Sequence, residues 1–171
     1  ACLPRKVDGF ASVEWLVIDD GSTDRTVEVA RENGVDHVHS LPHNQGLAKA
    51  FMSGLEAALC LGADVIVNTD GDNQYKAEFI EDLTRPIVNG EAEIAIGARP
   101  ISTIAHFSPV KRVMQNLGSW VVRKASGLDG ADAPSGFRAI HKSAAARLFV
   151  FNHYTYTLET IIQAGHLNIP V

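Results

Sequence analysis

The chain has 171 residues, of which 46% are hydrophobic and 20% charged, and its formal net charge is -5. This composition is typical of one ordinary globular domain and excludes a disordered or fibrous chain. The basic residues are scattered along the sequence. The chain therefore shows no sign of a broad basic surface that would bind nucleic acid or an anionic membrane.

The predicted elements alternate between apolar strands and amphipathic helices. In chain order they are a strand at 14–19, a helix at 22–34, a weak strand at 35–40, a helix at 46–62, a strand at 63–70, a helix at 77–90, a strand at 92–99 and a helix at 108–126. Ser22 or Thr23 is the expected N-cap of the first helix and Gly34 its end. Pro86 is expected to strain the helix that contains it. The apolar face of the second helix is predicted to comprise Leu47, Phe51, Leu55 and Ala58.

This alternation predicts an α/β fold with a mostly parallel sheet covered by helices on both faces. In such folds ligands bind beyond the carboxyl ends of the strands. Charged side chains follow three of the predicted strands, so we expect them to lie along one edge of the sheet. They are Asp19, Asp20, Asp70, Asp72 and Arg99.

Carboxylates gathered on one edge repel each other unless a cation lies between them. Asp70 and Asp72, separated by one glycine, offer the hard oxygen ligands that suit Mg²⁺ or Mn²⁺, and these ions bind substrate phosphates as well. The spacing alone leaves a second interpretation open, because Asp, Gly and Asn are also ordinary turn residues.

Four segments together carry a resemblance to a known family. "LVIDDGSTDRT", "NTDGDNQY", "IGAR" and "SGFRA" occur in this order along nearly the whole chain. They resemble the family 2 glycosyltransferases of the GT-A fold, in particular the branch with dolichyl-phosphate mannose synthase and bacterial polyprenyl-phosphate sugar transferases. The resemblance implies an inverting transfer of a sugar from a nucleotide diphosphate donor, with a metal on the Asp-x-Asp motif.

The resemblance also implies roles for individual residues. The residues expected to bind the donor are Asp19, Asp20, Asp70 and Gln74, and those expected to bind the metal are Asp70 and Asp72. The residues expected to bind the acceptor phosphate are Arg99, Arg112, Ser135 and Arg138. A guanidinium group can bind two phosphate oxygens at once. The residues expected to act in catalysis are Asp72, Arg99 and Asp132.

The acceptor decides whether a general base is needed. A polyprenyl phosphate is already ionised at neutral pH and needs none, whereas a saccharide hydroxyl must lose a proton, for which Asp132 is the candidate. Two other functions stay open. A nucleotidyltransferase would be expected to show a glycine-rich, basic N-terminal loop, which the sequence lacks, and a non-catalytic nucleotide-sugar-binding domain would keep the fold without turnover.

The chain departs from the family at both ends. It lacks the first buried strand that ends in Pro-x-Asn-Glu, and it stops at "LNIPV", inside what looks like a further strand. We therefore expect residues 1–171 to be a single GT-A domain that is incomplete at both ends. The missing central strand is expected to leave a gap in the sheet or to be replaced by another segment or chain.

The expected partners are a nucleotide sugar and a lipid phosphate at a membrane surface, without nucleic acid, and a homodimer stays open. Cys2 and Cys60 have no paired spacing, which fits a reducing compartment. No apolar run approaches the roughly 20 residues of a membrane helix, and no signal-peptide pattern is present. The expected location is the cytoplasm, at the cytoplasmic face of the membrane.

Overall fold

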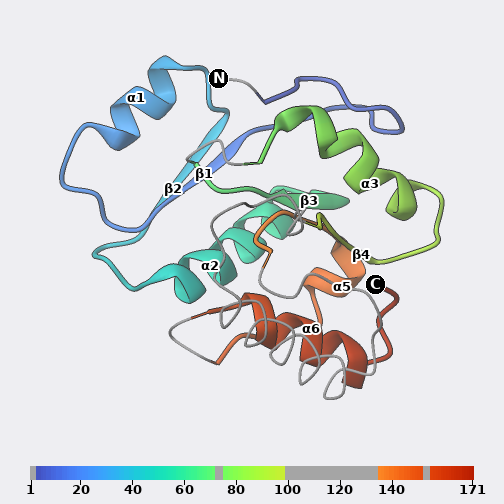
Figure 1. Ribbon diagram of the computed structural model, residues 1–171. Helices are drawn as coiled ribbons and strands as arrows, with labels where there is room; N and C mark the ends of the chain where they lie inside the picture. Colours follow the sequence, from blue (N-terminus) through green and yellow to red (C-terminus); the bar gives the residue numbers. More distant parts are fainter. Residues whose placement is uncertain (1–2, 72–74, 99–134, 152–154) are drawn as a thin grey trace, which may run out of the picture.

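A computed structural model describes residues 3–71, 75–98, 135–151 and 155–171 (Figure 1). The strands in these ranges are β1 (Leu16–Asp19), β2 (His37–Ser40), β3 (Val65–Asn68), β4 (Ile94–Ile96) and β5 (Arg138–His141). The helices are α1 (Thr26–Glu32), α2 (Leu47–Cys60), the 3₁₀ turn η1 (Ala77–Phe79), α3 (Ile80–Val88), α5 (Lys142–Ala145) and α6 (Thr157–His166). The helix predicted at 108–126 lies outside the described residues.

The described strands form two sheets. β1 and β2 pair in parallel, with Val17 opposite Val38, whereas β5 lies between β3 and β4 and is antiparallel to both. β3 and β4 therefore run in the same direction. The predicted α/β class is confirmed, but no strand was predicted at β5, which lies between the two predicted strands and is antiparallel to both. Its register places Ile140 opposite both Ile66 and Ile94.

Helices cover both faces of the three-stranded sheet (Figure 1). Successive residues of β5 point to opposite faces, because side chains alternate along a strand. Ile140 packs in a cluster with Tyr156 and with residues of α2, α5 and α6, among them Phe51. Ala139 and Phe137 pack in a second cluster with α3. Ala139 and Ile140 of β5 are almost completely buried, so this strand lies at the centre of the core.

Among the helices that the structure describes, four end with the same hydrogen-bond pattern, in which a residue with positive φ follows the helix. Gly34 does so after α1, as predicted, and Asn168 does so after α6. The predicted N-cap of α1 was wrong. The helix starts at Thr26, and the side chain of Asp24 accepts the Thr26 amide.

The structure also tests the predictions for α2, α3 and the C-terminal residues. Leu47 is 57% exposed, so it does not belong to the predicted apolar face of α2, and Ala48 is buried there instead. Pro86 lies inside α3, as predicted. Residues 167–171 form no strand, and the carbonyl of Pro170 accepts the amides of Glu93 and Ile94.

In the described ranges no helix combines the length and the apolar character needed to cross a membrane.

Candidate functional site

The carboxylates that end β1 are held by main-chain amides. Asp20 accepts the amide of Gln45 at 2.7 Å with one oxygen and the amide of Gly46 at 2.9 Å with the other. Gly46 is the N-cap of α2, so Asp20 joins the end of β1 to the start of that helix. Asp19 accepts the Ser22 amide at 3.0 Å and is buried. Each carboxylate thereby has a defined orientation, which a ligand site requires.

A close backbone approach explains the glycine that follows these acids. Gly21 has a φ of +74°, and a Cβ at this position would lie 2.5 to 2.7 Å from main-chain atoms of His43 and Asn44. No side chain fits there. The turn after β1 and the loop before α2 are therefore in direct contact, and only glycine permits it.

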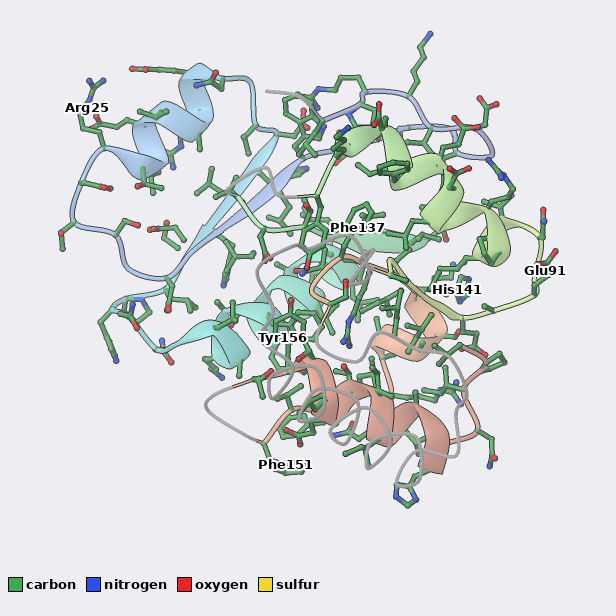
Figure 2. The ribbon with its side chains drawn as sticks, viewed as in Figure 1. Arg25, Glu91, Phe137, His141, Phe151 and Tyr156 are labelled. Atoms are coloured by element: carbon green, nitrogen blue, oxygen red, sulfur yellow. The ribbon has the colours of Figure 1, made fainter. Side chains whose placement is uncertain are left out.

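Asp70 follows β3 and lies beside a loop from a distant part of the chain. A Cβ on Gly136 would lie 3.3 and 3.5 Å from the two carboxylate oxygens of Asp70 and 3.0 Å from the Tyr156 hydroxyl. The carboxylate is exposed at the loop edge, whereas Gly136 is buried. Figure 2 labels Tyr156, beside the start of α6, and Phe137, which lies between the sheet and α3.

Three polar side chains hold this loop in place. Asn68, the last residue of β3, donates to the Gly136 carbonyl at 2.8 Å and to the Tyr156 hydroxyl at 2.9 Å. The Gly136 amide donates to the Tyr75 hydroxyl at 3.3 Å. No sequence motif predicted the roles of Asn68, Tyr75 and Tyr156. A polar residue at the end of an apolar strand was the one local signal, whereas the Asn68–Tyr156 contact spans 88 residues.

Aromatic stacking fixes the two tyrosines further. The rings of Tyr156 and Phe51 stack with centroids 3.9 Å apart and an interplanar angle of 9°. Tyr75 stacks on Phe137, with centroids 5.2 Å apart and an angle of 12°. Each hydroxyl is therefore presented to the Gly136 loop by a ring that belongs to the core.

Ser135 and Arg138, predicted to bind an acceptor phosphate, are both buried, Arg138 being 1% exposed. The Arg138 guanidinium donates to the carbonyls of Ser135 and Thr157 at 2.8 Å and to the Thr160 hydroxyl. These bonds tie β5 to α6. The phosphate role stays a prediction for both residues, and their burial favours a structural role instead.

The remaining predicted site residues lie outside the described ranges, so the expected common edge of carboxylates stays a prediction. These residues are Asp72, Gln74, Arg99, Arg112 and Asp132. Within the described ranges, no group of three or more His, Cys, Asp or Glu side chains is placed to hold a metal ion. The Glu159 carboxylate accepts the Phe151 amide at 2.9 Å.

Two groups in the site have a shifted pKa. The side-chain hydroxyl and the amide of Ser22 lower the pKa of Asp19, and burial opposes this only in part. Burial raises the pKa of Tyr156, and the negative charge of Asp70 acts in the same direction. At neutral pH Asp19 is therefore ionised and the Tyr156 hydroxyl keeps its proton.

A family profile described as "Glycosyl transferase family 2" matches residues 8–154. Among curated proteins, the chain is 32% identical over 148 residues to a UDP-N-acetylglucosamine–dolichyl-phosphate N-acetylglucosaminyltransferase of Methanococcus voltae, and the match covers 75% of the chain. It is 29% identical over 143 residues to a polyprenol monophosphomannose synthase of Mycolicibacterium smegmatis, with 80% covered. The matches span 59% and 54% of these two relatives, so the chain corresponds to little more than half of each.

Among solved structures, the chain resembles glucosyl-3-phosphoglycerate synthase from Mycobacterium tuberculosis, determined in complex with Mn²⁺, UDP-glucose and phosphoglyceric acid. The TM-score is 0.60 at 22% sequence identity, and the match covers 81% of this chain and 50% of the other. A likeness at this level of identity establishes the fold, and the fold is the GT-A fold that the sequence predicted.

Proposed function

Because the chain belongs to glycosyl transferase family 2, whose profile covers residues 8–154, we propose that it transfers a hexosyl group from a nucleotide diphosphate sugar to the phosphate of a polyprenyl or dolichyl lipid. The observation that carries this proposal is Asp70 at the end of β3, beside the loop that contains Gly136. The family profile spans both segments. UDP- and GDP-sugars are both open as donors.

Three relatives support the lipid phosphate as acceptor. Their names specify dolichyl phosphate, polyprenol monophosphomannose and undecaprenyl phosphate. Such a phosphate is ionised at neutral pH, so its oxygen attacks without a general base. Because Ser135 and Arg138 are buried, the proposal assigns the acceptor phosphate to Arg99 and Arg112, whose guanidinium groups suit it.

The acidic motif fits a divalent cation. Asp70 supplies exposed, hard carboxylate oxygens at a loop edge, and the motif's second acid, Asp72, supplies more. The solved relative that binds UDP-glucose binds Mn²⁺ with it, which supports a metal here, and Mg²⁺ and Mn²⁺ both suit these ligands. When bound, the ion would offset the negative charge of the nucleoside diphosphate as that group leaves.

The proposed reaction is a single displacement with inversion. An acceptor phosphate oxygen forms a bond to the anomeric carbon, and the bond from that carbon to the diphosphate breaks. The nucleoside diphosphate leaves with the electron pair, and no proton is transferred. The arginines hold the acceptor for in-line attack, while Asp19, Asp20 and Gln74 orient the donor.

The experiment compares nucleotide affinity of the full-length protein with Mn²⁺ and with EDTA, by calorimetry with UDP and GDP. Asp70→Asn and Asp72→Asn should each abolish the Mn²⁺ gain, which is the increase in nucleotide affinity in Mn²⁺ relative to EDTA. Asp64→Asn is the matched control, because Asp64 precedes the same strand at its opposite end and bonds Lys142. An unchanged Mn²⁺ gain in the Asp70 and Asp72 variants would overturn the metal assignment.

The acceptor is tested separately by transfer of labelled sugar to polyprenyl phosphate in detergent. Arg99→Ala and Arg112→Ala should each weaken acceptor binding by about 1.5–3 kcal/mol, the range for a charge-assisted hydrogen bond, and leave donor affinity nearly unchanged. A saccharide acceptor is the alternative. It would be favoured by transfer to a sugar hydroxyl that Asp132→Asn abolishes, and a non-catalytic domain would be favoured by nucleotide binding without any transfer.

The lipid acceptor also determines where the protein would act. We propose the cytoplasmic face of a membrane, because the acceptor is embedded in a bilayer and the cysteine pattern fits a reducing compartment. Flotation of the full-length protein with vesicles that contain polyprenyl phosphate tests the first part. The same preparation, analysed by light scattering, tells a monomer from a homodimer.

A further inference from the structure

Residues on either side of the acidic motif both bind the main chain of Gly136. Asn68 comes two residues before Asp70, and its side-chain amide donates to the Gly136 carbonyl. Tyr75 comes three residues after Asp72, and its hydroxyl accepts the Gly136 amide. Both main-chain polar groups of Gly136 are therefore engaged by the segment that contains the motif.

The third member of this arrangement is Tyr156, whose hydroxyl accepts from Asn68 at 2.9 Å. Tyr156 is 2% exposed and its ring stacks on Phe51, so the hydroxyl has little freedom to move. The distances from a Cβ built on Gly136 place this hydroxyl and the Asp70 carboxylate against the same side of the glycine. Hydrogen bonds in a partly buried network restrict the side chains that form them, and this restriction also limits the movement of the groups in contact with them.

We propose that Tyr156 and Asn68 are positioning residues that hold the Gly136 loop against Asp70 and so orient its carboxylate for a divalent cation. The inference rests on the proposed function, in which Asp70 is a metal ligand. An exposed carboxylate otherwise samples several rotamers, and ordering it when the ion binds lowers the affinity. Groups behind the ligands of a metal site commonly change its affinity by about 10–100-fold.

Gly136 has a specific part in this arrangement. Its φ is not in the positive range, so another residue is not excluded by the backbone. An added methyl group would instead contact the Tyr156 hydroxyl and the Asp70 carboxylate at 3.0 to 3.5 Å. Gly136→Ala should therefore displace the carboxylate without unfolding the chain.

The test uses the full-length protein and measures the ratio of UDP and GDP dissociation constants in EDTA and in saturating Mn²⁺. Tyr156→Phe removes one hydroxyl and keeps the stacked ring. It should reduce the Mn²⁺ gain by about tenfold and leave the affinity in EDTA unchanged. Gly136→Ala should have an effect in the same direction. Electron paramagnetic resonance of Mn²⁺ alone, titrated into each variant, gives a readout independent of turnover.

The matched control is Thr160→Val, which also removes a buried hydroxyl, one turn further along α6. The Thr160 hydroxyl donates to the Tyr156 carbonyl and accepts a bond from Arg138. Its loss should therefore lower the melting temperature of Thr160→Val about as much as that of Tyr156→Phe. The Mn²⁺ gain of Thr160→Val should match the wild type. A wild-type gain in Tyr156→Phe, or an equal loss in Thr160→Val, would overturn the inference. Absence of any gain in the wild type would instead overturn the metal assignment itself.

Discussion

The acids at the ends of β1 and β3 are held by different means. After β1, Asp20 is bonded by two main-chain amides, of Gln45 and Gly46. After β3, Asp70 lies beside a glycine whose position is set by the side chains of Asn68 and Tyr75. The first region is built from backbone turns, and the second from side chains that come from several elements.

The difference predicts which kind of substitution each region tolerates. A backbone turn depends on conformation, so it is sensitive at glycines and tolerant of many side chains. A network of buried side chains depends on each bonded atom, because removal of one partner leaves another buried group without a bond. Five experiments test this contrast, and they are ordered by the size of the expected effect.

Removal of Arg138 should have the largest effect. Arg138→Ala would remove the guanidinium donor from the buried Ser135 carbonyl. It would also remove the bonds to the Thr157 carbonyl and the Thr160 hydroxyl, which connect β5 to α6. We expect a loss of about 3–5 kcal/mol in the free energy of unfolding, measured by urea denaturation. Arg147→Ala is the control, since its partly exposed pair with Glu93 should contribute about 0–1 kcal/mol. Full stability with a selective loss of acceptor affinity would instead restore the phosphate role of Arg138.

The turn after β1 should be most sensitive at Gly21. Gly21→Ala combines a positive φ with a collision against the main chain of His43 and Asn44, and we expect a loss of about 2–4 kcal/mol. Gly62→Ala has a similar φ, +86°, with nothing within 4 Å, so it should lose about 1–2 kcal/mol. Equal losses in the two variants would show that the close approach of the two loops contributes nothing.

Local signals in the sequence revealed part of the first region. Gly34 ended its helix as predicted, and Asp19 and Asp20 marked the end of a strand that the structure confirms as β1. These features depend on neighbours in sequence, so periodicity and turn chemistry reveal them. The N-cap was missed because Asp24 bonds an amide two residues away, which allows several starting points.

The second region could not be predicted in the same way. β5 is a short strand whose register depends on β3 and β4, and its buried Arg138 does not look like a core residue. Tyr156 and Asn68 are 88 residues apart in the sequence, and only the folded chain brings them into hydrogen-bond contact. Such contacts need tertiary structure, whereas the family motifs indicated where Asp70 and Gly136 lie in the chain without showing what holds them together.

Asp20 allows a graded test of the backbone-bonded region. Asp20→Asn keeps one carbonyl oxygen and should lose about 1–2 kcal/mol of stability, because a charge-assisted bond from one amide is removed. Asp20→Ala removes both acceptors and should lose more. Urea denaturation of both variants provides the series. A reversed order, with the Ala variant more stable, would mean that the amides of Gln45 and Gly46 find other acceptors.

The acid limit of stability should depend on Asp19. Its pKa is lowered in the folded state by the Ser22 hydroxyl and amide, so its contribution is present above the unfolded pKa, about 4, and is lost as pH falls through the folded value. Asp19→Asn should therefore flatten the decline in stability below that pH, measured by urea denaturation at a series of pH values. If stability declines as steeply in Asp19→Asn as in the wild type, other carboxylates cause the loss of stability in acid.

The alkaline limit should depend instead on Tyr156, in the other region. Burial raises the pKa of its hydroxyl above the ordinary value of 10.0, so the folded state keeps the proton longer than the unfolded chain. Its contribution is fully present below pH 10 and is lost as pH rises through the folded value, because the unfolded chain then gains stability by ionising. The stability of Tyr156→Phe should consequently decline less than that of the wild type above pH 10. Tyr75→Phe, which leaves Tyr156 in place, should keep the wild-type decline. If both variants decline like the wild type, the hydroxyl of Tyr156 is not shielded from solvent, and the network around Gly136 is less rigid than its hydrogen bonds indicate.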